Sequence, residues 1–211
     1  MVSGCCDKAL ILLSGGMDSA AALWWSKKNN YEISTLSFQF PGRRSGEIRA
    51  VEALRQAVGC QENFDLNIPF LDPPEADLGC YIPQRNLMYY GIAASLAEKI
   101  NAGTLIGGHF LADGNTFPDA TQTYFNQLQS LLNLGWKRGP RLRLVFPFIT
   151  SNKEDIVRHG QNLGVPFHLT WSCSRHGLTH CWKCGSCRER VEGFIRSGVS
   201  DPLFDQSQVS I

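Results

Sequence analysis

Residues Lys8 to Trp25 read KALILLSGGMDSAAALWW, and this stretch decides the fold of the chain. The apolar run from Ala9 to Leu13 is typical of a strand buried on both faces. The Ala-rich segment that opens at Asp18 and Ser19 is typical of a helix packed on that sheet. The turn that joins them therefore lies at the carboxyl end of a parallel strand and at the amino end of a helix. Its two glycines let the backbone approach an anion closely, and the free N–H groups of the helix start favour a phosphate.

The turn itself, SGGMDS from Ser14 to Ser19, matches the SGGxDS pattern of the PP-loop. It resembles the loop with which ATP pyrophosphatases bind ATP and adenylate a substrate, releasing pyrophosphate. It is not a Walker A loop, because no Gly-Lys-Ser or Gly-Lys-Thr follows the glycines. The alternative is an ordinary strand–turn–helix corner in which Ser14 and Asp18 only cap the helix.

The composition predicts a cytoplasmic globular protein. With 211 residues, 43% of them hydrophobic, the chain can bury a sizeable core. A formal net charge of +1 provides no broad basic surface, so nucleic-acid binding is not expected. No apolar run reaches the length of a membrane span, and the opening residues MVSGCCDK do not resemble a signal peptide. We therefore expect no membrane partner. In a reducing cytosol, the eight cysteines favour metal binding over disulfides.

Beyond the opening stretch, predicted strands alternate with predicted helices. β-branched and aromatic residues favour strands over Glu32 to Phe40, Asn63 to Ile68, Thr104 to Gly108 and Leu142 to Phe148. Apolar periodicity favours helices over Ser45 to Val58, Arg85 to Asn101, Phe125 to Leu134, Lys153 to Leu163 and Arg188 to Phe194. The proline-rich stretch 69–83 predicts a loop. This alternation predicts an α/β protein with a doubly wound parallel sheet. We divide it into an ATP-binding domain (residues 1–170), a zinc-binding C-terminal segment of the same domain (171–198) and a polar tail (199–211) that could be flexible.

Four cysteines near the end of the chain form a second motif. They are Cys173, Cys181, Cys184 and Cys187, and they include two C-x-x-C steps. Four thiolates from one loop can close a tetrahedral zinc shell, which leaves no open position for catalysis. An iron–sulfur cluster and a redox-active C-x-x-C pair are the alternatives. The nearby His176 and His180 could replace a cysteine as ligands, although we expect them at the surface or behind the ligands.

Two cations stand at predicted helix starts, where the helix dipole opposes a positive charge. Lys153 opens a helix for which Ser151 and Glu154 fit a capping box. If Lys153 faces the PP-loop, it could neutralise the triphosphate and the leaving pyrophosphate. Arg85 could hold a phosphate or a substrate carboxylate through two hydrogen bonds. Each could equally be a solvated surface residue. Weaker candidates for the role of Arg85 stand in an upstream loop: Arg43 and Arg44.

Taken in order, five segments resemble the 7-cyano-7-deazaguanine synthase family of the queuosine pathway. They are SGGMDS, LSFQF, IPQRN, NKEDI, and LTWSC with its CxxCxxCxER continuation. The resemblance runs from Leu10 to Phe194, nearly the whole domain. LTWSC with the four cysteines is its most family-specific part, whereas the PP-loop alone marks only the superfamily. The resemblance implies an adenine nucleotide alpha hydrolase-like fold.

The resemblance also implies an ATP-dependent ligase that forms a carbon–nitrogen bond. The carboxylate of 7-carboxy-7-deazaguanine would be adenylated, ammonia would displace AMP to give an amide, and a second activation would dehydrate the amide to the nitrile. The implied metals are zinc and magnesium, and magnesium would bridge the phosphates with help from Asp18. The implied residues form three groups: an ATP site of Leu13, Ser14, Gly15, Gly16, Met17, Asp18, Ser19 and Ser37; a catalytic group of Asp18, Ser19, Lys153 and Arg85; and a zinc site of Cys173, Cys181, Cys184 and Cys187.

The chain departs from the family pattern beside the expected substrate site. Where the family has a YGQRH-like segment after the second strand, this chain has FPGRR. Where the family has Asn, Asp-Tyr-Ser-Gly and Pro-Asp-Cys, this chain has GGHFLADGNTFPDA, which keeps Pro118 and Asp119. An enzyme that stops at the amide, or that joins the activated acid to another amine, is therefore an alternative. A PP-loop tRNA-modifying enzyme and a non-catalytic zinc- and nucleotide-binding module are further alternatives. The oligomeric state stays open, with a homodimer as one option.

Overall fold

A five-stranded parallel sheet forms the centre of the protein. The computed structural model describes residues 7–70 and 82–204. The strands stand in the order β3-β2-β1-β4-β5, and every neighbouring pair is parallel. Their bounds are β1 (Lys8–Leu12), β2 (Glu32–Gln39), β3 (Glu62–Asn67), β4 (Thr104–Ile106) and β5 (Arg143–Val145). The predicted α/β class and parallel sheet are confirmed.

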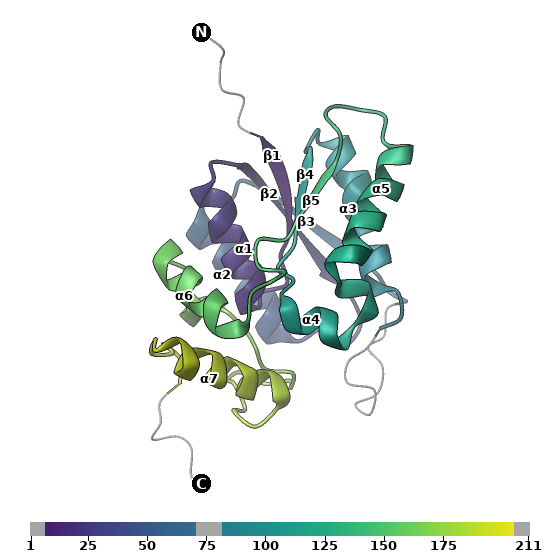
Figure 1. Cartoon of the computed structure of the whole chain (residues 1–211). Coiled ribbons are helices and arrows are strands. Elements are labelled where there is room, and N and C mark those ends of the chain that lie inside the picture. Colours follow the sequence, from purple (N-terminus) through teal and green to yellow (C-terminus); the bar gives the residue numbers. More distant parts are fainter. Residues whose placement is uncertain (1–6, 71–81, 205–211) are drawn as a thin grey trace.

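Helices cover both faces of the sheet (Figure 1). On one face, α1 (Met17–Lys28), α2 (Ser45–Val58) and α6 (Lys153–Leu163) pack together, and on the other face lie α3 (Arg85–Lys99) and α5 (Gln122–Gly135). Two further helices, α4 (Leu111–Thr116) and α7 (Gly185–Ser197), lie beyond the carboxyl ends of the strands. Short 3₁₀ turns complete the described elements, η2 (Pro118–Ala120) and η3 (Phe167–Leu169). Among the described residues, no helix is long and apolar enough to cross a membrane.

Strand β1 is buried on both faces, as its apolar run predicts. Ala9, Leu10 and Ile11 have no exposed surface. Because successive side chains of a strand point to opposite faces, Ala9 and Ile11 join the core under α1 and α6, whereas Leu10 joins the core under α3 and α5. One strand therefore ties the two cores of the domain together.

The connections reverse direction at β1. After β1 the chain proceeds outward through β2 and β3, and then returns so that β4 pairs with the opposite edge of β1. In open α/β sheets, ligands bind beyond the carboxyl ends of the strands at such a switch point. The loops that follow β1 and β4 both lie at this switch point, and α4 and α7 lie beyond it.

Some element boundaries differ from the sequence-based expectation. β5 covers Arg143–Val145 rather than residues 142–148, because the chain bends after the third residue and keeps only an isolated parallel bridge between Phe110 and Phe148. Helix α4 was not predicted, since its sequence LADGNT contains Gly, Asn and Thr, which are weak helix formers. Most of the predicted loop 69–83 lies outside the described residues, as do residues 205–211 of the polar tail.

Candidate active site

The PP-loop takes a conformation that requires glycine. Gly15 has φ of +94°, and a Cβ atom there would lie 2.7 Å from the carbonyl oxygen of Glu47 and 3.1 Å from Cβ of Ala50. Gly15 also accepts a hydrogen bond at its carbonyl from the backbone N–H of Trp171 at 2.9 Å. The loop is therefore clamped between α2 and the chain that leads to the cysteines.

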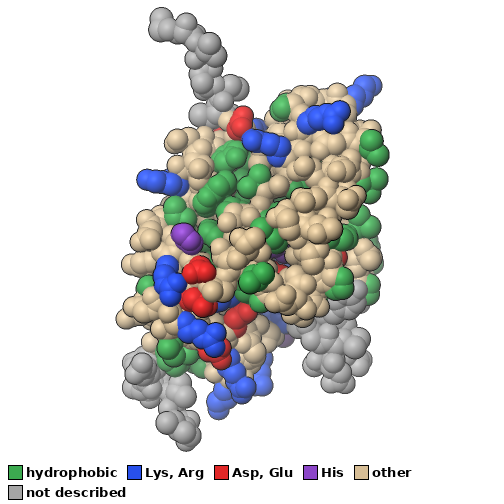
Figure 2. Space-filling view, viewed as in Figure 1, with side chains coloured by type: hydrophobic (Ala, Val, Ile, Leu, Met, Phe, Trp, Pro, Cys, Tyr) green, Lys and Arg blue, Asp and Glu red, His purple; other side chains and the backbone are tan. Residues whose placement is uncertain are grey.

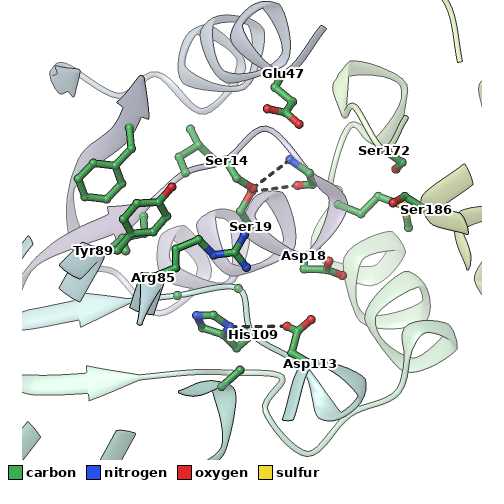
Figure 3. A pocket seen from close by; sticks show the side chains of 18 of the residues that line it. Ser14, Asp18, Ser19, Glu47, Arg85, Tyr89, His109, Asp113, Ser172 and Ser186 are labelled. Carbon is green, nitrogen blue, oxygen red and sulfur yellow. Dashed lines mark hydrogen bonds and ion pairs between the residues drawn. The ribbon is translucent and has the colours of Figure 1, made fainter. Parts of the chain in front are cut away.

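Two hydroxyls shape the inside of the loop (Figure 3). Ser14 Oγ donates to Ser19 Oγ at 3.1 Å and accepts from the N–H of Gly16 at 3.3 Å, and Ser19 Oγ donates to the carbonyl of Gly16 at 3.0 Å. The N-cap of α1 is Gly16, and no side chain within the described residues caps it. Ser14 and Asp18 therefore do not serve as side-chain caps, and the first N–H groups of α1 remain for an anion.

Arg43 supports the loop from behind. Its guanidinium donates to the carbonyl of Ser14 at 3.2 Å, to Ser37 Oγ at 2.9 Å and to the carbonyl of Phe38. Burial lowers the pKa of Arg43, and Glu47 acts in the opposite direction. Ser37 is itself buried and turns its hydroxyl to Arg43 rather than to the pocket. The second loop arginine, Arg44, donates to the carbonyl of Ser174 at 2.6 Å, so it joins this loop to the cysteine segment.

Lys153 connects three elements at the mouth of the loop. Its Nζ lies 2.7 and 2.9 Å from the two carboxylate oxygens of Asp18 and 3.4 Å from Glu189 Oε2 on α7, and 3.9 Å from the ring centre of Phe110. Burial lowers the pKa of Lys153, but Asp18 and Glu189 outweigh it, so the net pKa is raised and the amine is protonated at neutral pH. The opposing helix dipole is therefore compensated by two carboxylates.

The predicted capping box before Lys153 is wrong. The N-cap of α6 is Asn152, whose Oδ1 accepts from the N–H of Asp155 at 3.0 Å. Asn is as good a cap as Ser, and its position one residue closer to the helix decides between them. The helix itself begins and ends where the sequence predicts, at Lys153 and Leu163.

A pocket of 420 Å³ opens beside the loop and reaches toward α3 and α4. On this side Tyr89 stacks on Phe38 with ring centres 4.3 Å apart, and Arg85 lies 5.8 Å from the ring centre of Phe117. Tyr90 is 1% exposed, and its hydroxyl is the buried side-chain polar atom that finds no hydrogen-bond partner among the described residues. Burial raises the pKa of Tyr90 well above its usual value, so it stays a neutral donor. This half of the pocket therefore offers aromatic walls with a few polar groups, as small-molecule sites do.

The Pro118-Asp119 pair holds the start of α3. Asp119 Oδ2 accepts from the N–H of Asn86 at 3.1 Å, and the Asp119 carbonyl accepts from Asn86 Nδ2 at 2.8 Å. Both residues are buried. Asp119 therefore fixes the IPQRN segment, and with it Arg85, at the pocket wall.

The four cysteine sulfurs converge on one point. The sulfurs of Cys173, Cys181, Cys184 and Cys187 all lie within 4.8 Å of one another. Tetrahedral zinc bound at about 2.3 Å requires sulfurs about 3.8 Å apart, so the cluster fits a metal ion. Backbone N–H groups of Arg175 and Cys181 donate to Cys173 Sγ at 3.4 Å each, which suits a thiolate.

The histidines near the cysteines lie outside this cluster. His180 is 8% exposed, and its Nε2 accepts from the N–H of Ser172 at 3.0 Å. Its ring stands between those of Trp171 and Trp182, with ring centres 4.5 and 5.0 Å away. His176 is exposed. The expectation that neither replaces a cysteine agrees with these positions.

The C-terminal segment forms one wall of the pocket. The ring of Trp171 packs on Gly46 at the start of α2, in the space that a Cβ atom there would fill. Arg190, buried on α7, forms two hydrogen bonds with Asp201 at 2.7 and 2.8 Å and one with Thr170 Oγ1 at 2.8 Å. Sequence reasoning missed Glu189, which contacts Lys153 in the pocket, and Arg190, which holds the C-terminal segment in place. The CxxCxxCxER continuation contains both, so the charged pair after the last cysteine was the available signal.

The structure brings most predicted site residues into one pocket. Its lining includes the following residues from the prediction: Leu13, Ser14, Gly16, Met17, Asp18, Ser19, Arg85 and Lys153. Gly15 and Ser37 stand behind the wall in supporting positions.

Nearly the whole chain is similar to one protein family. The family model described as queuosine biosynthesis protein QueC matches residues 8–77 and 74–198. The 7-cyano-7-deazaguanine synthase of Thermoplasma acidophilum is 34% identical over 93% of this chain and 91% of its own length. The enzyme of the same name from a Nostoc species is 33% identical over 93% of this chain and 96% of its own length.

Solved structures with lower identity share the fold. An NMN synthetase from Francisella tularensis superposes with a TM-score of 0.55 at 14% identity, over 93% of this chain and 79% of its own. A 4-thiouridine synthetase in complex with RNA and ATP gives a TM-score of 0.54 at 22% identity, over 75% of this chain and 41% of its own. At these identities the likeness concerns the fold alone.

Proposed function

The chain belongs to the family of the queuosine biosynthesis protein QueC, and from this premise we propose that it makes 7-cyano-7-deazaguanine from 7-carboxy-7-deazaguanine, ammonia and ATP. Two relatives that bear the name of that synthase align with this chain over nearly their whole length. The name supports a role in deazaguanine synthesis. The order of the chemical steps and the residues that perform them are our proposal.

The phosphates of ATP would bind at the PP-loop. The first residues of α1 line the pocket, no side chain of the described residues caps the helix, and the Ser14 and Ser19 hydroxyls bond to each other there. Lys153 would leave one of its carboxylate partners to contact the leaving pyrophosphate, because a protonated amine beside a polyanion stabilises the charge that develops there. Arg43 would keep the loop in the open shape that the phosphates need.

The deazaguanine would bind on the α3 and α4 side of the same pocket. Tyr89 offers an aromatic face, Tyr90 a buried donor, and Arg85 a cation suited to a carboxylate. In the first step the substrate carboxylate attacks the α-phosphate, a carbon–oxygen–phosphorus link forms and pyrophosphate leaves. Ammonia then forms the carbon–nitrogen bond as AMP departs. A second ATP then adenylates the amide oxygen with release of pyrophosphate. That oxygen leaves with AMP while the nitrogen loses its two protons, and the nitrile forms.

Two metals would take part in different ways. The four cysteine thiolates fit a zinc ion, which would order the segment from Cys173 to Cys187 and leave no position open for chemistry. Asp18 and Glu189, whose carboxylates flank Lys153 in the pocket, are the candidates to hold magnesium, which would supply charge neutralisation for the phosphates.

The observation that carries the proposal is the single pocket. One cavity joins the loop, Lys153 and the aromatic wall around Tyr89, so a nucleotide and a planar acid could meet within it. A tRNA-modifying role lacks comparable support, since the net charge is +1. At the α6 and α7 end of the face shown in Figure 2, Lys and Arg side chains lie among Asp and Glu side chains. Because segment 107–120 departs from the family pattern, the amide is a second candidate end product beside the nitrile.

The test is turnover of the purified chain with ATP, 7-carboxy-7-deazaguanine and ammonium, followed by mass analysis of the products. We expect AMP, pyrophosphate and 7-cyano-7-deazaguanine, with no dependence on added tRNA. If the amide accumulates from the acid, and no nitrile forms even when the amide is supplied as substrate, the enzyme stops one step earlier. ATP turnover that requires tRNA, or no turnover, would overturn the proposal.

A further inference from the structure

His109 stands where the loops after β1 and β4 meet. It follows Gly108, at which a Cβ atom would lie 2.5 Å from the backbone nitrogen of Ser19 and 2.7 Å from its Cα. The backbone after β4 is therefore pressed against the first turn of α1, and only a residue without a side chain fits there. The next side chain, that of His109, lines the pocket within reach of the loop proposed to hold the phosphates.

The ring of His109 is held in one orientation. Its Nδ1 lies 3.6 Å from Oδ2 of Asp113, and a dashed line joins the two side chains in Figure 3. Its ring packs against those of Phe125 and Phe146, with ring centres 4.8 and 5.5 Å away. Asp113 is itself fixed, because its Oδ2 accepts from the N–H of Phe110 at 3.1 Å. Within the described residues, no group hydrogen-bonds to Nε2 of His109. An imidazole with a carboxylate at one nitrogen and the other nitrogen unengaged is arranged to accept a proton.

The cationic and phenolic side chains of the pocket are poorly suited to accept a proton at neutral pH, and two of its carboxylates, Asp18 and Glu189, are paired with Lys153. Lys153 is protonated and paired with Asp18 and Glu189. Tyr90 is a neutral phenol, and Arg85 and Arg43 are cations. Of the described residues that line the pocket, His109 is the only histidine. It also lies in the segment GGHFLADGNTFPDA, in which the chain departs from the family pattern.

We propose that His109 is the base for the amine step, in which ammonia attacks the adenylated acid, and that Asp113 positions it. This inference rests on the proposed function. The ammonia nitrogen donates its electron pair to the acyl carbon, and the nitrogen becomes positively charged. One proton passes from that nitrogen to Nε2 of His109, the carbon–oxygen bond to AMP breaks, and AMP leaves with the electron pair. Asp113 stabilises the resulting imidazolium through Nδ1–H. Adenylation itself does not use His109.

The experiment compares two nucleophiles on the holoenzyme and on its His109→Gln variant. Ammonia is mostly protonated at neutral pH and has to lose protons on the way to the amide. Hydroxylamine is largely unprotonated at neutral pH and traps acyl adenylates as hydroxamates with little need of a base. Three rates are measured at one pH: pyrophosphate release, amide plus nitrile formed from ammonia, and hydroxamate formed from hydroxylamine. The matched control is His159→Gln, a change of an exposed histidine on α6.

We expect His109→Gln to lower the ammonia-dependent rate by about 10²-fold or more, the usual contribution of a general base. The hydroxamate rate should fall less than about threefold, and His159→Gln should match the unsubstituted chain in both assays. Asp113→Asn should reproduce the selective loss in weaker form, because it removes the charge that supports the imidazolium.

An equal loss with both nucleophiles would overturn the inference, since it would make His109 a wall residue that merely holds the substrate. An unchanged ammonia rate would overturn it as well. In both cases adenylation by the unsubstituted chain would leave the proposed function standing. If the unsubstituted chain forms neither hydroxamate nor pyrophosphate, the proposed function fails first and the inference fails with it.

Discussion

The PP-loop corner and the four-cysteine segment lie against each other, yet they keep their shapes by different means. The corner, residues 8–28, is built from a strand with no exposed apolar residue at its centre and a helix with eight buried residues. The segment from Trp171 to Cys187 has a small cluster of its own, formed by Ala50, Trp171, Cys173 and Cys187. Packing against the sheet therefore secures the corner, whereas we expect the segment to depend on a metal ion held by its thiolates.

The difference matters because the two regions share contacts. Trp171 donates its N–H to the carbonyl of Gly15, and Lys153 joins Asp18 of the corner to Glu189 of α7. Loss of order in the segment would therefore reach the loop. Replacement of a loop side chain should leave the metal site in place, since Asp18 and Ser19 do not belong to the four-cysteine cluster. We expect an asymmetry between the two regions, and four experiments test it.

The largest effect is expected in the loop. Asp18→Ala and Ser19→Ala should each lower AMP formation by about 10²- to 10³-fold, because they remove groups that contact or organise the phosphates. Metal content should stay at one ion per chain, since neither residue touches the cysteines. Rates of AMP formation and elemental analysis check both statements. Unchanged ATP turnover in both variants would remove the loop from the mechanism.

A cysteine variant should show the opposite pattern. Cys184→Ser should remove the metal and lower the unfolding free energy by roughly 3 kcal/mol or more, which shifts Tm downward by about 6–12 °C in a chain of this size. Activity should fall with it, because Trp171 and Glu189 lose their support. Cys60→Ser is the control, since Cys60 lies outside the cluster. Iron with acid-labile sulfide, or an equally stable protein without metal, would contradict the zinc assignment.

Lys153→Met probes the residue that the two regions share. It leaves the carboxylates of Asp18 and Glu189 facing each other without a cation, and the side chain it replaces is 11% exposed. We expect a loss of about 1–3 kcal/mol in stability together with a 10- to 100-fold slower AMP formation. The helix dipole alone would predict a slight gain in stability, so the sign of the change in Tm decides between the two effects.

The smallest effect is expected at the contact between Trp171 and α2. Gly46→Ala should displace the Trp171 ring and cost about 1–3 kcal/mol, as overpacking does. Gly91→Ala is the matched control, because it lies inside α3 with nothing within 4 Å of the added Cβ. It should stabilise the protein by about 0.5–1 kcal/mol, the difference in helix propensity. Thermal unfolding of both variants measures the pair, and equal shifts would show that Trp171 does not couple the regions.

Local patterns explain how much of the fold the sequence could predict. The helices Ser45–Val58 and Lys153–Leu163 begin and end as expected, because apolar periodicity, Gly59 and Gly164 all act within a few residues. Helix α4 could not be predicted in this way, because its own sequence, LADGNT, carries no local helix signal and tertiary contacts favour the helix instead. Neither the capping box at Ser151 nor an opposing dipole at Lys153 describes that helix start, because Asn152 caps it and distant carboxylates pair with the lysine.

The sequence by itself determined the α/β class, the PP-loop turn after β1 and the set of four cysteines, because each depends on residues close together along the chain. Only the tertiary structure decided which side chains meet. Lys153 reaches Asp18 across 135 positions, Arg43 supports Ser14 from the loop between β2 and α2, and Gly108, the residue before His109, lies against Ser19. These contacts depend on the order of the strands in the sheet, which places β4 next to β1. Periodicity and turn chemistry carry no record of that order, so the partners of the charged residues in the pocket could not be read from the sequence.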